Sequence, residues 1–289
     1  MLGRSCTRST SPVASSSRRG DPVSEAAVSP WLTIVTVVKD DAAGFERTMN
    51  SIAQQDLNGV EWLIIDSSTD SIALPALLAS EVAPTNHYAW TEPHGIYPAM
   101  NAGLARATGT YVYFLNAGDS FAGPNAVGTI RGAVVAEPKW LYGQVRFVDE
   151  AGNAVTPTPF DYAVEKKHAF SRGRFPPHQG TIVRTDVLRR VGGFDESFRI
   201  AADYNAMLSL SRVGDPIEMA NVLAEFVTGG ASSQQWRRSV REFHRARQAT
   251  FALAGADRLW ETLRTAKQWL LLWSHNKLAG ATSKSKDGR

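Results

Sequence analysis

The sequence predicts an α/β fold in which a mostly parallel β-sheet is covered by helices and followed by a C-terminal helical extension. Apolar, β-branched runs alternate with stretches whose apolar residues recur at helical spacing, as in parallel strands joined by helices. Several runs end in polar, acidic residues, as strands do where a sheet edge binds ligands. Hydrophobic residues make up 43% and charged residues 20% of the chain, the balance of a globular protein.

Composition excludes several classes of function. The formal net charge of +3 is too small to indicate a nucleic-acid partner. The single cysteine, Cys6, excludes internal disulfides and a cysteine-rich zinc site. The chain has no run of about 18 apolar residues, so we expect no transmembrane helix. Residues 1–20 contain no apolar core of a secretory signal, and we expect residues 1–29 to be a disordered tail.

The first predicted strand spans residues 31–38, an apolar and β-branched run. Asp40 or Asp41 is expected to cap the helix that follows, since a short acidic side chain accepts hydrogen bonds from the first free N–H groups. The inner face of that helix carries three apolar residues at helical spacing: Phe45, Met49 and Ile52.

A second strand is predicted over residues 60–65, and it ends in the polar stretch 66–70. A short helix over residues 72–78 and a third strand over residues 87–90 follow. Because strands that alternate with helices pair in parallel, the polar ends of these strands are expected at one edge of the sheet.

The stretch from Gly95 to Asp119 combines a helix, a strand and an acidic loop. The helix has an apolar stripe at helical spacing: Ile96, Met100, Leu104 and Ala107. Gly109 is expected to end this helix in the left-handed conformation. Residues 111–115 then form a strand buried on both faces, which delivers residues 116–119 to its carboxyl end.

Asp119 has two interpretations. A carboxylate beside small residues at a strand end can hold a divalent cation against the phosphates of a ligand. It can equally cap a helix that begins near Pro124. The chain contains no glycine-rich dinucleotide fingerprint and no phosphate-loop lysine motif, which disfavours a dehydrogenase or an ATPase.

The second half of the chain predicts a strand over residues 140–148 and a long, proline-containing loop over residues 150–175. A later helix opens near residue 200 with Asp203 in its first turn, where the helix dipole favours a carboxylate. We expect the main domain to span residues 30–230 and the helical extension residues 231–289.

A helix predicted over residues 258–278 has apolar residues near one face and basic residues close by. The apolar residues are Leu259, Leu263, Leu270 and Trp273, the basic ones Arg264, Lys267 and Lys277. The helix either closes over the core or lies on a membrane surface, where Trp260, Trp269 and Trp273 would favour the interface. With no signal peptide and no spanning helix, we expect a cytoplasmic protein, and on the second interpretation one with peripheral contact at the inner face of the plasma membrane.

Five segments together resemble the inverting family 2 glycosyltransferases of the GT-A fold, especially the branch that builds bacterial polysaccharides and glycolipids. They are LTIVTVVKDD (32–41), EWLIIDSSTD (61–70), the stretch 95–119, HQGTIVR (178–184) and GGFDESFRIAADYN (192–205). The resemblance implies transfer of a sugar from a nucleotide-diphosphate donor to a hydroxyl of a lipid-linked or saccharide acceptor, with inversion at the anomeric carbon.

The same resemblance implies roles for individual residues. Asp203 would be the general base that takes the proton of the acceptor hydroxyl, and Asp119 would hold Mg²⁺ or Mn²⁺ against the donor diphosphate. Contacts to the nucleotide sugar are implied for Thr36, Asp66, Asn101, Asn116, His178 and Gln179. Asp70 is a second candidate for the role given to Asp66.

Two rival functions stay open. Asn116 and Gly118 stand where many relatives carry aspartate, which leaves room for a non-catalytic sugar-nucleotide-binding or scaffold protein. The retained Asp203 argues against that alternative. A nucleotidyltransferase would want a glycine-rich basic loop early in the chain, and residues 38–44 are not one.

Overall fold

A computed structural model of the protein describes residues 29–69, 86–149, 152–155, 159–165, 173–228 and 235–286. The predicted tail, except Ser29, lies outside these residues, as do the predicted helix over residues 72–78 and the candidate Asp70. Within the described part of the chain, no helix has both the length and the apolar character needed to cross a bilayer.

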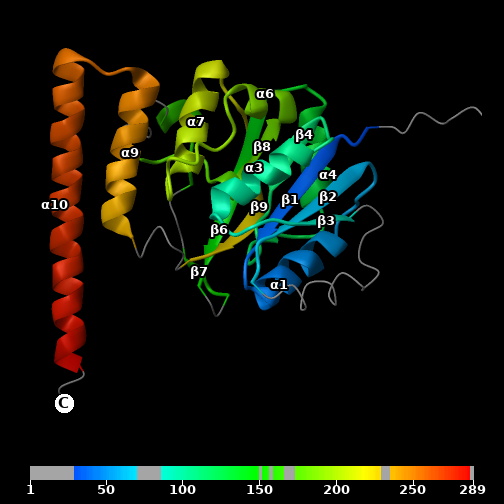
Figure 1. The fold of residues 1–289 in the computed structure, drawn as a ribbon, viewed down its shortest axis with the longest axis horizontal. Coiled ribbons are helices and arrows are strands. Elements are labelled where there is room, and N and C mark those ends of the chain that lie inside the picture. The colour runs from blue at the N-terminus through cyan, green and yellow to red at the C-terminus, as the bar shows by residue number, and fades with distance from the viewer. Residues whose placement is uncertain are drawn as a thin grey trace, which may run out of the picture.

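The described strands form a single sheet in the order β3-β2-β1-β4-β8-β6-β9-β5, with β7 paired to β6 (Figure 1). Their bounds are β1 Leu32–Val38, β2 Val60–Asp66, β3 Asn86–Trp90, β4 Tyr111–Phe114, β5 Ser120–Phe121, β6 Trp140–Val148, β7 Ala154–Val155, β8 Thr181–Arg184 and β9 Ile217–Val227. Strands β3, β2, β1 and β4 are parallel neighbours, which confirms the predicted parallel half of the sheet. Strand β8 runs antiparallel to both β4 and β6.

Helices cover both faces of the sheet (Figure 1). Their bounds are α1 Ala42–Ala53, α3 Ile96–Arg106, α4 Ala126–Val134, α6 Thr185–Arg190, α7 Ala202–Val213, α9 Trp236–Phe251, α10 Gly255–Lys286 and the short 3₁₀ helix η1 His178–Gly180. One core cluster joins β1, β2 and β4 to α3, α6 and α7, and the other joins the opposite side of these strands to α1 and α4. The sheet is therefore buried on both faces, as its continuous apolar strands indicate.

The predicted apolar stripe of α3 is buried at Met100, Leu104 and Ala107, but not at its first position. Ile96 is 45% exposed, and the adjacent Tyr97 is buried in its place. The left-handed conformation expected at Gly109 is also wrong, because α3 ends when Ala107 turns to extended backbone. Gly109 is needed for space, since a Cβ there would lie 2.6 Å from the backbone nitrogen of Thr33 on β1.

The structure decides between the candidate caps of two helices, α1 and α4. Asp41 caps α1, with its Oδ1 accepting from the Gly44 N–H at 2.8 Å. Asp119 does not cap α4, because that helix begins at Ala126 with Asn125 as its N-cap residue. The capping interpretation of Asp119 is therefore wrong.

Helices α9 and α10 stand at one end of the molecule, with α9 between α7 and α10 (Figure 1). Helix α10 has 32 residues and α9 has 16, so α10 runs well past the end of its neighbour. Trp269 of α10 packs against Trp236 of α9 with ring centroids 5.9 Å apart. Trp269 is therefore turned toward α9, whereas Trp260 and Trp273 are exposed.

Candidate active site at the strand ends

The carboxyl ends of β2, β1 and β4 lie side by side because these strands are parallel neighbours. Asp66 is the last residue of β2 and is fully buried. Its two oxygens accept hydrogen bonds from the Ser68 N–H and the Tyr88 hydroxyl, both at 2.8 Å. Burial and then this bond to Asp66 raise the pKa of Tyr88 to about 12, so the tyrosine stays a donor at neutral pH.

The turn that follows β4, residues 116–119, is fixed by helix α1. The Thr48 hydroxyl donates to the Asp119 carbonyl at 2.6 Å and accepts from the Gly118 N–H at 3.1 Å. Gly118 has φ +94°, a left-handed conformation that glycine adopts without strain. The turn therefore presents the side chains of Asn116 and Asp119 from a rigid backbone.

The Asp119 carboxyl group is buried and yet poised to ionise. Burial raises its pKa to about 7, although His178 nearby and a hydrogen bond from the Gln179 side chain both act to lower it. The carboxyl group is therefore close to half-ionised at neutral pH, and a cation beside it would favour the charged form.

Asn116 and His178 form a directed contact. The Asn116 side-chain nitrogen lies 3.2 Å from Nε2 of His178, and the amide nitrogen can only donate, so Nε2 accepts. The neutral imidazole then carries its proton on Nδ1, which lies 3.5 Å from Oδ2 of Asp203. Asn116, His178 and Asp203 are thus linked across the end of β4, η1 and α7.

Asp203 is in the first turn of α7, as predicted, and its side chain is 18% exposed. Its Oδ1 lies 3.1 Å from the Tyr97 hydroxyl and 2.8 Å from the Tyr204 N–H. Burial, with the nearby charge of Asp203, raises the pKa of Tyr97 far above its ordinary value, so the phenol keeps its proton. Among the hydrogen bonds and ion pairs of the described residues, the one contact of Asp203 Oδ2 is the 3.5 Å contact to Nδ1 of His178.

Sequence reasoning missed Tyr97. The helical spacing of apolar residues gave the inward position to Ile96, although Tyr97 is the residue that reaches Asp203. The available signal was its place in the first turn of the helix that follows Gly95, which begins after the carboxyl end of a strand.

The residues on the 116–119 turn fit a divalent cation. Oδ1 of Asn116 is buried and has no hydrogen-bond partner within the described chain. It is therefore available, together with the Asp119 carboxyl group on the same turn, to coordinate a cation. No group of three or more His, Cys, Asp or Glu side chains in the described residues could enclose a metal. This donor set suits Mg²⁺ or Mn²⁺, which take few protein oxygens and complete their shell with phosphate and water.

Three predicted contact residues do not join this set. The Thr36 hydroxyl is inside the core, where it accepts from the Trp62 indole N–H at 3.0 Å. Asn101 bonds to both backbone groups of Phe194, at 2.7 and 3.0 Å, and so ties α3 to the loop before α7. Asp66 lies at the same sheet edge, but its bonds go to Ser68 and Tyr88.

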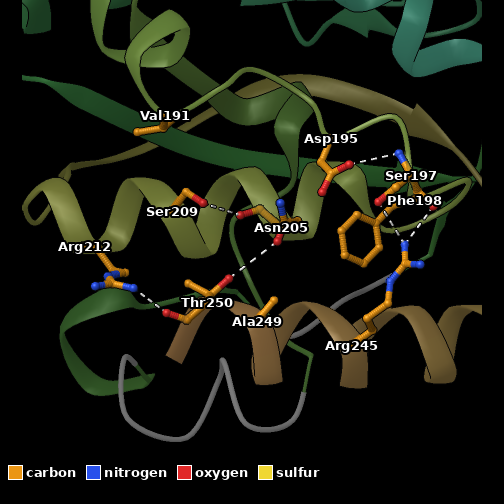
Figure 2. Close-up of a pocket in the computed structure, with 10 residues that line it drawn as sticks. All are labelled: Val191, Asp195, Ser197, Phe198, Asn205, Ser209, Arg212, Arg245, Ala249 and Thr250. Atoms are coloured by element: carbon orange, nitrogen blue, oxygen red, sulfur yellow. Dashed lines mark hydrogen bonds between the residues drawn. The ribbon is translucent and has the colours of Figure 1, made fainter. Parts of the chain in front are cut away.

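A cavity of about 550 Å³ between α7 and α9 lies outside this site (Figure 2). Asn205 and Ser209 of α7 are among the residues that line the cavity, and none of the predicted site residues lines it. Its polar groups bond to one another: Arg245 donates to the Ser197 carbonyl at 2.7 Å, and Thr250 donates to Asn205 at 3.5 Å. These bonds hold the two helices together.

Comparison with known sequences gives one family match. Residues 33–202 match the model described as Glycosyl transferase family 2. An uncharacterized glycosyltransferase of Mycobacterium tuberculosis is 31% identical over 213 residues, which cover 71% of this chain and 78% of that protein. The O-antigen biosynthesis protein RfbC of Myxococcus xanthus is 28% identical over 65% of this chain and 15% of its own length.

Solved structures give the same fold at low sequence identity. Residues 1–349 of S. aureus TarS in complex with UDP-GlcNAc superpose with a TM-score of 0.60 at 14% identity, over 82% of this chain and 70% of that one. The mannosyltransferase PcManGT from Pyrobaculum calidifontis, in complex with GDP-Man and Mn²⁺, gives a TM-score of 0.59 at 19% identity, over 91% of this chain and 77% of that one. The predicted nucleotide-diphospho-sugar transferase fold, GT-A, is thereby confirmed.

Proposed function

We propose, from the premise that the chain belongs to glycosyl transferase family 2, that it moves a sugar from a nucleotide-diphosphate donor to a hydroxyl of a glycolipid or polysaccharide, with inversion at the anomeric carbon. Family membership makes the chain a transferase enzyme. The observation that carries the rest is the linked set of Asn116, His178, Asp203 and Tyr97 beside the ionisable Asp119. These residues would supply a proton acceptor and a cation ligand at one edge of the sheet.

Asp203 would be the general base. An acceptor hydroxyl is a weak nucleophile, and a carboxylate within hydrogen-bond reach raises the rate by about 10²–10⁴-fold. Tyr97 and the Tyr204 N–H hold Oδ1 in place, which leaves Oδ2 to take the proton. The acceptor oxygen then bonds to the anomeric carbon as the bond to the diphosphate breaks. The nucleoside diphosphate leaves with the electron pair, and a single displacement of this kind inverts the configuration.

Asp119 and Asn116 would hold the Mg²⁺ or Mn²⁺ ion. When bound, such an ion neutralises the charge that develops on the departing diphosphate. The protein supplies two oxygen-bearing side chains, of which the Asn116 oxygen has no other partner in the described chain. Because the pKa of Asp119 is about 7, binding the ion releases a proton from part of the population at neutral pH.

The donor would lie along the edge between Asp66 and the 116–119 turn. The buried Asp66 at the end of β2 is hydrogen-bonded to the partly exposed Tyr88 of β3, and the exposed Trp90 lies two residues further along β3. A nucleotide base and ribose need such polar and aromatic groups. Two structural neighbours are complexes with UDP-GlcNAc and GDP-Man, which supports a donor of this class.

Helix α10 would bring the enzyme to an anionic membrane surface that holds the acceptor lipid. Its side away from α9 exposes six large apolar residues: Leu259, Trp260, Leu263, Leu270, Leu271 and Trp273. The basic residues Arg264 and Lys267 are exposed beside them. An apolar helix face flanked by cations binds at the interface of anionic lipid, and each cation contributes about 1 kcal/mol there.

Thermal unfolding with a panel of donors tests the proposal. UDP-GlcNAc, UDP-glucose, GDP-mannose and dTDP-rhamnose are each added with Mn²⁺, and release of the nucleoside diphosphate is followed in parallel. A ligand at 100 times its Kd stabilises the folded state by about 2.7 kcal/mol. A rise in Tm with turnover supports the proposal. A rise without turnover supports the non-catalytic alternative, and no rise with any donor contradicts nucleotide-sugar binding.

A further inference from the structure

Helix α7 has no side-chain cap at its N-cap position. Its N-cap residue is Ala201, whose side chain has no hydrogen-bonding group. The first N–H groups of a helix need acceptors, and here the acceptor comes from α9. Oε2 of Glu242 accepts from the Ile200 N–H at 2.8 Å and from the Ala201 N–H at 3.1 Å.

Glu242 is held in this position as an anion. It is 7% exposed, and its other oxygen accepts from Nε of Arg238 at 2.8 Å. Burial acts to raise the pKa of Glu242, but the Arg238 bond and the backbone N–H groups outweigh it, so the pKa lies below its ordinary value. A carboxylate at the positive end of a helix dipole is also favoured electrostatically.

The contact continues from Glu242 to Asp203 through one peptide and one tyrosine. The N–H of Ile200 donates to Glu242, and the carbonyl of Ile200 accepts from the Tyr97 hydroxyl at 2.5 Å. The same hydroxyl lies 3.1 Å from Oδ1 of Asp203. Glu242 therefore fixes the backbone that fixes the tyrosine beside the proposed base.

Other contacts between α9 and its neighbours lie farther from Asp203. Figure 2 shows Arg245 reaching the loop before α7, where it bonds to Ser197 and stacks over the Phe198 ring at 3.9 Å. At the opposite end of the helix pair, Arg212 of α7 donates to the Thr250 carbonyl of α9. Of these contacts, Glu242 alone bonds to the two residues directly before α7, Ile200 and Ala201.

We propose that Glu242 is a positioning residue for Asp203: by capping α7 from α9 it holds the Ile200 carbonyl and the Tyr97 hydroxyl where they orient the carboxylate. The inference rests on the proposed role of Asp203 as the base. Glu242 does not touch the substrate. Its loss is expected to lower kcat by about tenfold to a hundredfold, the cost of misplacing a reacting group by about 1 Å, with little change in donor KM.

Three variants of the full chain test this role. Glu242→Ala removes the cap, Glu242→Gln keeps an accepting oxygen for the Ile200 N–H, and Arg212→Ala removes the contact between α7 and α9 at the far end. Nucleoside diphosphate release is measured with UDP-GlcNAc and with GDP-mannose, together with Tm. We expect kcat to fall in Glu242→Ala, to be largely restored in Glu242→Gln and to stay near wild type in Arg212→Ala at a similar loss of Tm.

An equal loss of kcat in Glu242→Ala and Arg212→Ala would overturn the proposal, because it would report general loosening of the helix pair. A crystal structure of Glu242→Ala gives a readout that does not depend on turnover: we expect the contact between Tyr97 and Asp203 to be lost. If that contact persists, Glu242 does not position Asp203. If Glu242→Ala does not fold, the test rests on Glu242→Gln. A wild-type kcat in Glu242→Gln, with Asp203 in its wild-type position, supports the role of the accepting oxygen. A kcat in Glu242→Gln as low as that of an inactive enzyme contradicts it. Wild-type turnover in Asp203→Asn would instead refute the base assignment, whatever Glu242 does.

Discussion

Replacing Asp203 by asparagine tests the proposed base at one atom. The amide keeps the shape of the carboxylate, and its oxygen can still accept from the Tyr97 hydroxyl and the Tyr204 N–H. Its nitrogen takes the place of Oδ2, which lies 3.5 Å from Nδ1 of His178. An amide nitrogen cannot accept a proton, so the variant loses the base while most of the surrounding contacts remain.

The expected fall in kcat is about 10²–10⁴-fold, the contribution of one positioned general base. This corresponds to about 2.7–5.5 kcal/mol, at about 1.4 kcal/mol for each factor of ten. Donor affinity is expected to change less than about twofold, because the interaction removed is made in the transition state. The groups proposed to hold the donor diphosphate, Asp119 and Asn116, are on the turn after β4 and keep their positions.

The assay measures the rate of nucleoside diphosphate release at saturating donor and the donor Kd from thermal shifts. Asp195→Asn is the matched control, because it also removes one negative charge near α7. The Asp195 side chain is exposed, where it accepts from the Ser197 N–H at 2.9 Å. A wild-type rate in Asp203→Asn, or an equal loss in both variants, would refute the reasoning.

Three further predictions follow from the carboxylates and from α10. Burial raises the folded-state pKa of Asp119 to about 7, so the metal-free protein loses the stability that this group contributes as pH rises from about 4 through 7. For the same reason, added Mn²⁺ raises Tm more above pH 7 than below it. Asp119→Asn should abolish both effects in Tm scans, and an unchanged pH dependence of Tm in this variant would contradict them. Glu261→Ala should cost about 3–5 kcal/mol in urea unfolding, because it leaves the buried Arg247 unpaired, and a loss below about 1 kcal/mol would count against this pair. Liposome co-sedimentation should show that the full chain binds anionic vesicles in a salt-sensitive way and does not bind neutral vesicles. This binding should be lost in the double variant Leu263→Asn/Leu270→Asn and in a chain that ends at Ala256. If all forms stay equally soluble with anionic vesicles, α10 is a purely structural helix.

The strands could be predicted because a strand that is buried on both faces needs an uninterrupted run of apolar and β-branched residues, which is visible in the sequence. The run 31–38 contains no interior charge, as a strand covered on both faces requires, and β1 is observed at Leu32–Val38. Asn116, His178 and Asp203 could be placed at one site because each lies in a segment that resembles the family. Their mutual contacts could not be predicted, since they depend on the packing of η1 against α7.

The residues that were missed share a physical reason. Spacing identifies an apolar face, but residues three and four positions before Met100 both lie near that face, and Tyr97 took the place given to Ile96. Glu242 belongs to a strongly charged segment that is typical of a solvated helix. Its partners Ile200 and Ala201 lie about forty positions earlier in the chain, and no local pattern connects them.

The two carboxyl groups of the site, Asp119 and Asp203, have different surroundings. Asp119 is buried and its pKa rises to about 7, whereas Asp203 receives hydrogen bonds from Tyr97 and the Tyr204 N–H and is partly exposed. Two carboxyl groups in different environments can take different roles, here a cation ligand and a proton acceptor. Helix α9 bonds to the turn before α7 through Glu242 and to α10 through the buried Arg247–Glu261 pair. On the proposed function, the face of α10 that would contact lipid and the base that would meet the lipid-linked acceptor are therefore both fixed against one helix, which sets the position of the active site relative to the membrane.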